Sequence, residues 1–261
     1  MNLLDNKAIQ IAIKNTKDKI RHWQYLTFSL GFAIMYTLLF YFFLGRNIFQ
    51  YSFPGMVIFI TAAGTQSAAI SLSADRTSGM LERLDTMPTG RKNIFLGALL
   101  SDTLLISLQV IAIFIIGYGI LQIPYKGLFE LFIGFFIALI FGISAVGIGV
   151  IISGIAKTPE IANAISLFYY LPILFLSGSL MPFESPIVFF TPPFWAKQVF
   201  LQITVMGNGL GDPLYSSSLF GPTGTAEPLA ISLLGGFLIE IAFAIGFIVI
   251  GIIIFQKKTK F

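Results

Sequence analysis

The stretch LFIGFFIALIFGISAVGIGVIISGI, residues Leu131–Ile155, runs for 25 residues without one charged side chain. A helix needs about 20 apolar residues to cross the roughly 30 Å hydrocarbon core of a bilayer, so this stretch is long enough to span a membrane. The whole chain has the same character, since 56% of its 261 residues are hydrophobic, 11% are charged and its mean hydropathy is +0.87. Soluble domains carry about 25% charged residues. We therefore predict an all-α integral membrane protein.

Six membrane spans can be drawn along the chain, with boundaries accurate to a few residues. The second contains Pro54 near its start, where a missing N–H group costs little, and the fifth contains Pro172. Together they predict a transmembrane domain over residues 25–255, followed by a short tail at 256–261. The spans are Tyr25–Leu44, Phe53–Ser73, Leu99–Leu121, Leu131–Ile155, Ile161–Met181 and Ala230–Phe255.

The positions of the basic residues predict how the chain is oriented in the membrane. Six spans place both termini on one side. That side holds 13 of the 16 Lys and Arg residues, in the N-terminal segment, the 74–98 loop, position 157 and the tail. The opposite side holds Arg46, Lys126 and Lys197. Because cytoplasmic loops carry an excess of Lys and Arg, we expect a multi-pass protein of a prokaryotic plasma membrane with both termini in the cytoplasm.

Residues 1–24 precede the first span and predict a helix at the cytoplasmic membrane surface. Ile9, Ile13, Thr16 and Ile20 recur at helical spacing, and most charges lie off that stripe. The stripe is narrow, so an ordinary solvated helix is the alternative. The segment begins with polar and charged residues, and we therefore expect no cleavable signal peptide.

The connection before the last span, residues 182–229, is long and is predicted to be external. It holds seven of the 12 prolines, so it cannot form one spanning helix. Its first part is rich in aromatic residues and predicts short helices at or dipping into the outer interface, a depth that suits Trp195. Its second part, from Gly207, predicts an exposed loop.

The composition excludes several classes of chemistry. The chain has no cysteine and one histidine, which rules out disulfides, thiol catalysis and a Cys/His metal site. It has no Gly-Lys dipeptide and therefore no phosphate-binding loop of the GxxxxGK[ST] type. No nucleophile–base pair is visible, so an enzyme is not expected. The basic residues flank apolar spans, a pattern that favours a membrane face over nucleic acid.

The stretch LSADRTSGMLERLDTMPTGRKN, residues 72–93, holds seven of the chain's 28 charged residues. Met80, Leu84 and Met87 fall on one face of a short helix, which Pro88 ends. The pattern predicts an amphipathic cytoplasmic helix between spans two and three. Physical arguments leave two interpretations open, a plain positive-inside loop and a docking element for a soluble partner.

The segment DRTSGMLERLDTMPTGRKNIFLGALLS, residues 75–101, resembles the first cytoplasmic loop of type-2 ATP-binding cassette (ABC) transporter permeases. A second resemblance lies in LPILFLSGSLMPFESP, where Pro172 and Pro182 flank Leu-Ser-Gly at 176–178. The chain departs from the family where Thr-Pro-Pro at 191–193 replaces a common Asn-Pro. The resemblance implies that this loop couples the chain to an ATPase. The matching positions are Asp75, Arg76, Gly79, Glu82, Arg83, Leu84, Pro88 and Arg91.

The resemblance implies a role for the whole chain. Two permease halves, alike or different, pair in the membrane above two ATP-binding subunits, and the loop acts as a coupling helix. The chain itself would then carry no cofactor, with ATP and Mg²⁺ bound by the partner ATPase. A mostly apolar lining with scattered hydroxyls suggests export of a hydrophobic or amphipathic substrate such as a drug-like molecule or a lipid.

Polar residues inside the spans are candidates for a translocation path, because buried polar groups in membranes are often functional. By resemblance, spans two and five face the cavity between halves, although packing within one subunit is the alternative, as it is for the small-residue stripe of Ala145, Gly149 and Ser153. Asp102 is expected to be wetted near the cytoplasmic end of span three. The candidate path residues are Thr61, Thr65, Asn163, Ser166, Tyr169 and Glu240.

Glu240 also supports a second hypothesis from a different class. It could line a wet cavity, or stay protonated against a neighbour such as Gln109. A stand-alone channel or ion-coupled carrier could use it as a proton or ion site. Such a carrier would follow an ion gradient without ATP.

We predict that Glu82→Ala or Gly79→Pro impairs coupling while the protein still inserts into the membrane. Membrane fractionation would measure insertion, and ATP-driven transport with the partner ATPase would measure coupling. Normal ATP-driven transport by both variants would rule out a coupling role for this segment.

Overall fold

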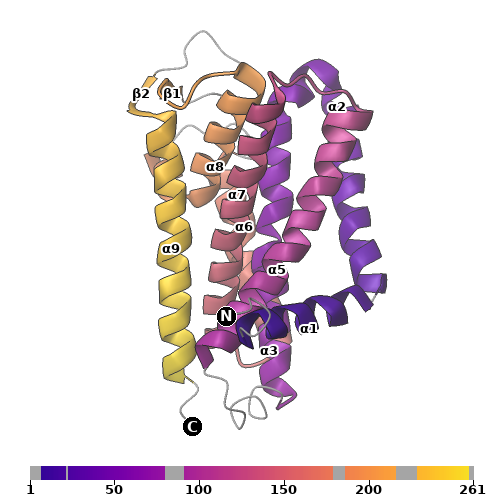
Figure 1. The fold of residues 1–261 in the computed structure, drawn as a ribbon, viewed down its shortest axis with the longest axis vertical. Coiled ribbons are helices and arrows are strands. Elements are labelled where there is room, and N and C mark those ends of the chain that lie inside the picture. Colours follow the sequence, from indigo (N-terminus) through magenta and orange to yellow (C-terminus); the bar gives the residue numbers. More distant parts are fainter. Residues whose placement is uncertain (1–6, 22, 80–90, 179–185, 216–227, 259–261) are drawn as a thin grey trace.

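In the computed structural model the described residues, 7–21, 23–79, 91–178, 186–215 and 228–258, form a bundle of long helices (Figure 1). The predicted all-α membrane fold is confirmed. Within the described ranges, five helical segments are long and apolar enough to cross a membrane, so the chain is a multi-pass membrane protein. They are Ser29–Thr77, Asn93–Ile120, Leu128–Ile155, Pro159–Leu176 and Leu233–Ile254.

The first of these segments folds back on itself at Gly45, inside α2 (Trp23–Ala62). Gly45 has φ 71° and ψ 159°, a conformation essentially restricted to glycine. The rings of Tyr36 and Phe59 are 5.1 Å apart, whereas a straight helix would separate these positions by about 34 Å. The segment therefore contains two antiparallel legs, and the predicted spans Tyr25–Leu44 and Phe53–Ser73 occupy them. The count of six crossings stays a prediction.

The second leg continues through α3 (Gly64–Thr77) after a break at Ala63. The sequence placed Pro54 near the start of a span, and this was wrong. The leg is helical from Arg46, so Pro54 lies inside the helix.

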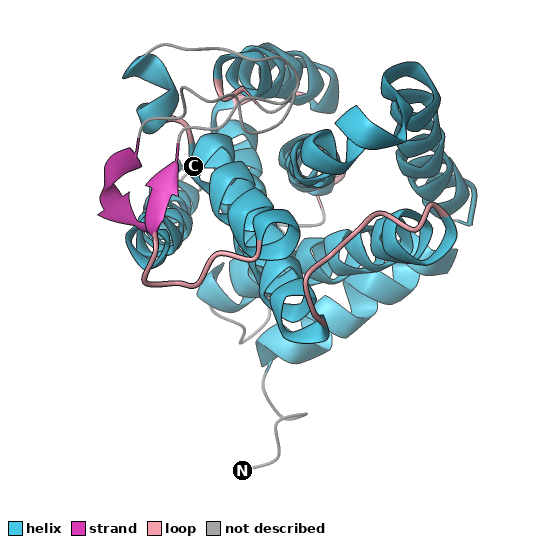
Figure 2. Ribbon diagram, turned by 90° about the horizontal axis from the view of Figure 1, so that it is seen from above, coloured by secondary structure: helices cyan, strands magenta, loops and turns pink. Residues whose placement is uncertain are grey.

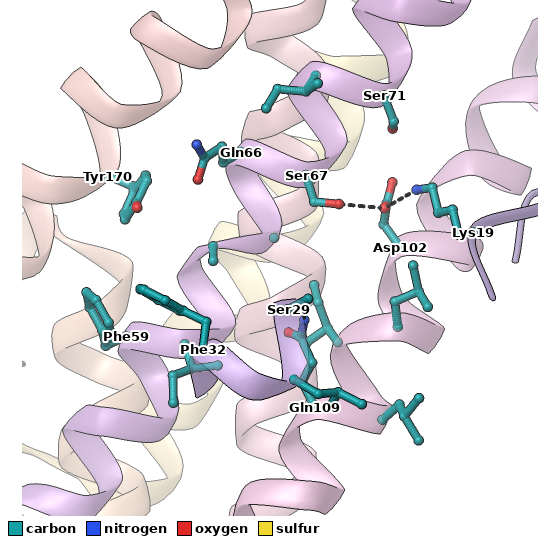
Figure 3. Close-up of a pocket in the computed structure, with 18 residues that line it drawn as sticks. Lys19, Ser29, Phe32, Phe59, Gln66, Ser67, Ser71, Asp102, Gln109 and Tyr170 are labelled. Atoms are coloured by element: carbon teal, nitrogen blue, oxygen red, sulfur yellow. Dashed lines mark hydrogen bonds and ion pairs between the residues drawn. The ribbon is translucent and has the colours of Figure 1, made fainter. Parts of the chain in front are cut away.

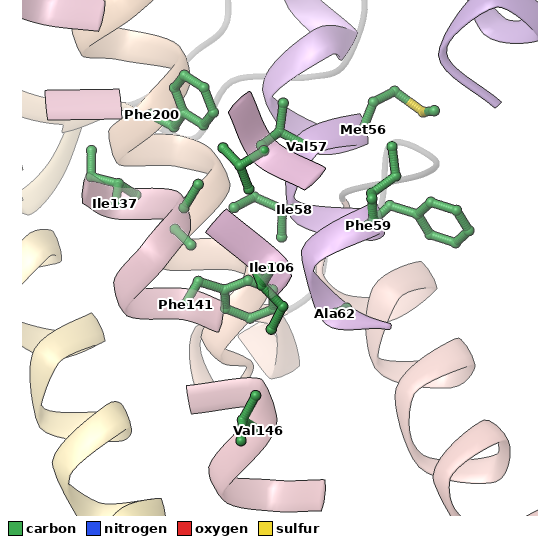
Figure 4. Close-up of a cluster of buried hydrophobic side chains, with 14 of the residues drawn as sticks. Met56, Val57, Ile58, Phe59, Ala62, Ile106, Ile137, Phe141, Val146 and Phe200 are labelled. Atoms are coloured by element: carbon green, nitrogen blue, oxygen red, sulfur yellow. The ribbon is translucent and has the colours of Figure 1, made fainter. Parts of the chain in front are cut away.

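Helix α6 (Leu128–Ile155) packs against α3, α5 (Arg91–Phe114) and α9 (Leu233–Lys258). Its small-residue stripe permits close approach, since a Cβ atom on Gly149 would lie 2.3 Å from the carbonyl oxygen of Thr65 on α3. The stripe therefore serves helix packing within this chain. Figure 4 shows the apolar core here, where Ile58 of α2, Ile106 of α5 and Phe141 of α6 lie together.

The end of one helix and both ends of another have distinct local structure. Helix α5 continues as the π-helical turn η2 (Ile115–Ile120). Helix α7 (Pro159–Leu176) starts behind an N-cap, with the Thr158 hydroxyl accepting from the Ile161 N–H. The fifth span was predicted to reach Met181, but α7 ends at Leu176, and residues 179–185 lie outside the described part of the chain.

The predicted short helices before the last span are present as η3 (Pro186–Phe190), α8 (Pro192–Leu201) and η4 (Gln202–Met206). The Thr-Pro-Pro departure forms the start of α8, with Thr191 as its N-cap. All ten residues of α8 are buried, in packing against α2, α6 and α9 (orange in Figure 1). Trp195 is 4% exposed and lies in the protein interior, and Pro192 and Pro193 begin its helix. The depth of this helix relative to the outer interface stays a prediction.

Lys197 was counted among external loop charges, yet its side chain is only 1% exposed. Its ammonium group donates to the carbonyl oxygen of Gly178, 2.8 Å away, which ties α8 to the end of α7. Burial lowers the pKa of Lys197 to about 8.

The segment predicted to be exposed loop contains a small antiparallel hairpin of β1 (Pro213–Tyr215) and β2 (Pro228–Ser232), with Pro213 opposite Ser232. Gln202 holds it by bonding both backbone groups of Tyr215. Seen along the bundle in Figure 2, the hairpin lies at the edge of the helices.

Helix α1 (Lys7–Arg21) lies across the end of the bundle to which the C-terminal end of α9 also extends (Figure 1). It packs on α5 through Ala8 and Ala12, each 4% exposed. Ile13 and Ile20 of the predicted stripe are each 49% exposed on a different face. Thr16 of the same stripe instead donates to the Ser101 hydroxyl on α5 at 3.1 Å, so only part of the stripe is exposed, and the interfacial position stays a prediction.

We predict that Gly45→Ala lowers the free energy of unfolding by about 1–3 kcal/mol, because a Cβ atom strains this backbone conformation. Nothing lies within 4 Å of the new Cβ position, so the cost comes from the backbone alone. Gly31→Ala on the same helix is the matched control, since its site is equally open but helical. It should be neutral or stabilising by up to about 1 kcal/mol. Unfolding of the purified chain in SDS would measure both, and equal effects would contradict the role of Gly45.

Candidate functional site

A cavity of about 670 Å³ lies between α1, both legs of α2, α3 and α5, with Tyr170 of α7 at one side (Figure 3). This volume lies within the range of small-molecule sites. Most of the lining is apolar and comes from Leu30, Phe32, Phe59, Ile60, Leu105 and Leu108.

An ion pair forms the polar end of the cavity. The ammonium nitrogen of Lys19 on α1 lies 2.5 Å from Oδ1 of Asp102 on α5. The Ser67 hydroxyl of α3 donates to the same oxygen at 3.3 Å (Figure 3). Asp102 is 2% exposed, so the expectation of a wetted carboxylate was wrong. The reason is that α1 packs on α5 and, with α3, covers the carboxylate, which hydropathy along the chain does not reveal.

Two side-chain amides complete the polar lining. Gln66 of α3 donates to Oδ1 of Asn163 on α7 at 2.5 Å, and Gln109 of α5 donates to the Ser29 hydroxyl on the first leg of α2. Gln66, Ser29 and Lys19 were not predicted from the sequence to line a cavity. An amide in an otherwise apolar span was the available signal, because burying an amide is costly unless it is hydrogen-bonded.

None of the six candidate path residues is among those that line this cavity. Thr61 and Ser166 are fully buried and donate to backbone carbonyls of their own helices. Thr65 and Tyr169 line a much smaller cavity between α3, α6, α7 and α8. Asn163 reaches the larger cavity only through its bond to Gln66. Their roles in transport stay predictions.

Glu240 on α9 is 1% exposed, and neither carboxylate oxygen has a hydrogen-bond partner among the described residues. It lies close enough to Tyr169 to interact electrostatically, and it lines neither of the two cavities. The suggested neighbour Gln109 was wrong, since Gln109 bonds to Ser29.

The predicted coupling segment is described in part. Asp75 and Arg76 occupy the last turn of α3, and the Arg76 guanidinium donates to the carbonyl oxygen of Ala156 at the end of α6. Gly79 follows with φ 71°, the left-handed conformation that favours glycine after a helix end. Arg91 is the first residue of α5. The remaining positions, Glu82, Arg83, Leu84 and Pro88, lie outside the described residues, so the coupling helix stays a prediction.

In the part of the chain that the structure describes, no group of three His, Asp or Glu side chains is placed to hold a metal ion. The polar end of the cavity pairs one carboxylate with one ammonium, and the Ser67 hydroxyl donates to the same carboxylate oxygen.

A comparison with known protein families identifies the family to which this helical bundle belongs. The family model described as "ABC-2 type transporter" matches residues 7–207. This chain belongs to the ABC-2 type transporter family. The match includes α1, the cavity and helix α8.

One relative of this ABC-2 family chain is the probable multidrug ABC transporter permease YbhR of Escherichia coli. The two are 29% identical over 154 residues, which cover 58% of this chain and 41% of the relative. The putative transport permease ycf38 of Cyanophora paradoxa is 31% identical over 54% of this chain and 49% of its own length. ABC transporter G family member 20 of Dictyostelium discoideum is 28% identical over 61% of this chain and 21% of its own length. The chain thus spans less than half the length of these relatives.

We predict that Lys19→Met in this ABC-2 family chain lowers the free energy of unfolding by about 3 kcal/mol, because it leaves the buried Asp102 carboxylate without its counter-charge. The double variant Lys19→Met/Asp102→Leu should recover most of that loss, since both charges are then removed. SDS unfolding of the two single variants and the double variant forms a double-mutant cycle. Additive losses would show that the pair contributes no coupling energy.

Proposed function

We propose that the chain is the membrane-spanning half of an ATP-driven ABC exporter for a hydrophobic or amphipathic molecule. The family supports a transport subunit. The observation that carries the substrate class is the cavity, whose lining is mostly apolar with polar groups gathered at Lys19, Asp102 and the amides.

The proposed partners are an ABC ATPase subunit, which binds ATP and Mg²⁺, and a second permease half of the same or a different sequence. The absence of a phosphate-binding loop from this sequence supports a separate ATPase chain. The coupling role goes to residues 74–98, which run from the last turn of α3 into the first two turns of α5. Helix α1 and the last turns of α9 lie at the same end of the bundle, which supports a cytoplasmic docking face there (Figure 1).

The cavity has a side that suits entry from the membrane. Phe32 and Leu108 line it and are 40% and 41% exposed, so the side of the cavity that they form is not closed by packing within this chain. An amphipathic molecule dissolved in the bilayer can pass between these side chains without entering water first. The cavity is within this chain, so each half of a dimer would carry one.

The ion-coupled carrier hypothesis has less support. It relies on Glu240, which is buried away from both cavities. An ion that reached Glu240 would need another path. Transport that follows an ion gradient without ATP, and that is lost in Glu240→Gln, would favour the carrier over the exporter.

The test begins with affinity purification of the tagged chain, co-expressed with the neighbouring reading frames, which the proposal expects to encode an ABC ATPase. We expect the ATPase to co-purify and the complex to extrude a lipophilic dye from vesicles when ATP is supplied. If no phosphate-loop subunit co-purifies and no cognate ATPase is stimulated, the proposed function fails.

We predict that Ala63→Phe reduces ATP-driven dye transport to less than about a tenth, because the ring fills the cavity that Ala63 lines. Ala74→Phe is the matched control, since Ala74 is also half-buried but lies near the end of α3, away from the cavity lining. Equal transport by the two variants would show that the cavity is not on the transport path.

A further inference from the structure

Asp102, which lines the cavity, has a buried acceptor oxygen to which none of the described residues donates. Oδ1 of Asp102 accepts from Lys19 and Ser67, whereas Oδ2 has no hydrogen-bond partner among the described residues. A buried carboxylate oxygen without a partner is costly in a low-dielectric interior. Because Asp102 lines the cavity, a donor on a bound molecule can supply the bond that the chain does not.

Asp75 and the charged groups that interact with it, of which Asp102 is one, include one more acid than bases. The Asp75 carboxylate lies near enough to four other charged groups to interact with them, and the five together comprise three acids and two bases. The adjacent Arg76 is bonded to the carbonyl oxygen of Ala156. A cation is therefore the ligand charge that brings the set to neutrality. The five groups are Asp18, Asp75, Asp102, Lys14 and Lys19.

The rest of the cavity suits an apolar tail. Phe32, Phe59 and Tyr170 gather on the side opposite the ion pair (Figure 3). Phe32 and Leu108 are the lining residues with the largest exposed fractions among the described residues, so an apolar tail can reach them. A molecule with its head at Asp102 would extend its tail toward the bilayer.

We propose that this cavity binds a single-chain amphiphile with a primary ammonium head, which donates to Oδ2 of Asp102 while its tail lies along Phe32, Phe59 and Leu108. This inference rests on the proposed function to the extent that it names the substrate class of the same cavity. The binding itself requires only this chain.

The chemistry of the head group distinguishes a primary ammonium ligand from ligands with other heads. An anionic head would face Asp102 and Asp75 and make the local charge more negative. A hydroxyl head can donate a hydrogen bond but brings no positive charge. A quaternary ammonium brings the charge but has no N–H group for Oδ2 of Asp102. Dodecylammonium, dodecanol and dodecyltrimethylammonium therefore form a matched series of probes with one tail.

The chain has no cysteine, so a single introduced thiol can report on the cavity. Ser71 lines the cavity near Asp102, and Ser71→Cys in the purified full-length chain can be labelled with a maleimide in neutral detergent. We expect dodecylammonium to slow this labelling at concentrations about tenfold below those that dodecanol or dodecyltrimethylammonium requires. Ser78→Cys, exposed beyond the end of α3, is the control for effects of the detergent micelle and should show no protection.

Two variants in the Ser71→Cys background test the role of Asp102. Asp102→Asn should raise the concentration of dodecylammonium for half-protection by about tenfold, because the charged acceptor is lost. Lys19→Gln should lower that concentration, because the ligand then has no competing ammonium at Asp102. Gel filtration establishes that each variant is folded. If Asp102→Asn does not fold, Lys19→Gln and the probe series still test whether the cavity binds a primary ammonium head at Asp102.

The proposal is overturned if dodecanol protects as well as dodecylammonium, or if neither substitution changes the half-protecting concentration. This assay contains no ATPase and no transport step. Protection without ATP-driven transport would count against the exporter, whereas ATP-driven transport without protection would count against the ammonium site. The two failures are therefore distinguishable.

Discussion

The structure depends on a constraint that a membrane imposes, namely that a charge placed among apolar helices must be paired. Asp102 meets this constraint through Lys19, which comes from a helix more than 80 positions earlier in the chain. The bond joins α1 to α5, and Ser67 of α3 shares the same carboxylate oxygen. A single buried acid thus holds together three elements that surround the cavity. Because the pairing uses only one of its two oxygens, the same acid gives the cavity its polar character.

Close packing between helix backbones is the second feature that holds the bundle together. Inside lipid there is no hydrophobic gain from bringing two helices together, so small residues that permit close contact become decisive. Gly149 of α6 provides such a contact with α3, and Gly45 lets α2 reverse its direction. Helix α8 fills the space that remains, and Lys197 attaches it to the carbonyl of Gly178. The wall of the cavity is therefore backed by tightly packed helices on one side and is open on the other.

The family and the cavity address different parts of the function. Membership of the ABC-2 type transporter family places the chain in a transport system, and the shared segment of residues 7–207 covers every element that lines the cavity. The cavity adds a chemical preference that the family does not specify, since an apolar groove with one buried acid favours molecules with a tail and a donor head. The segment assigned to coupling begins at the end of α3, one helix turn after residues that contact the cavity. Movement of α3 would therefore affect both the cavity and the segment assigned to coupling.

The sequence by itself determined the all-α membrane fold, the apolar segments and the short helices before α9, because these follow from local composition and from proline. It also led to the family through residues 75–101. Only the tertiary structure decided that Asp102 is buried, that Lys19 is its partner, and that Gln66 and Gln109 line a cavity while Thr61 and Ser166 do not. A hydropathy pattern shows that a residue lies in a span, but the rotation of each helix about its axis fixes which neighbours it meets. That rotation is set by packing between segments far apart in the chain.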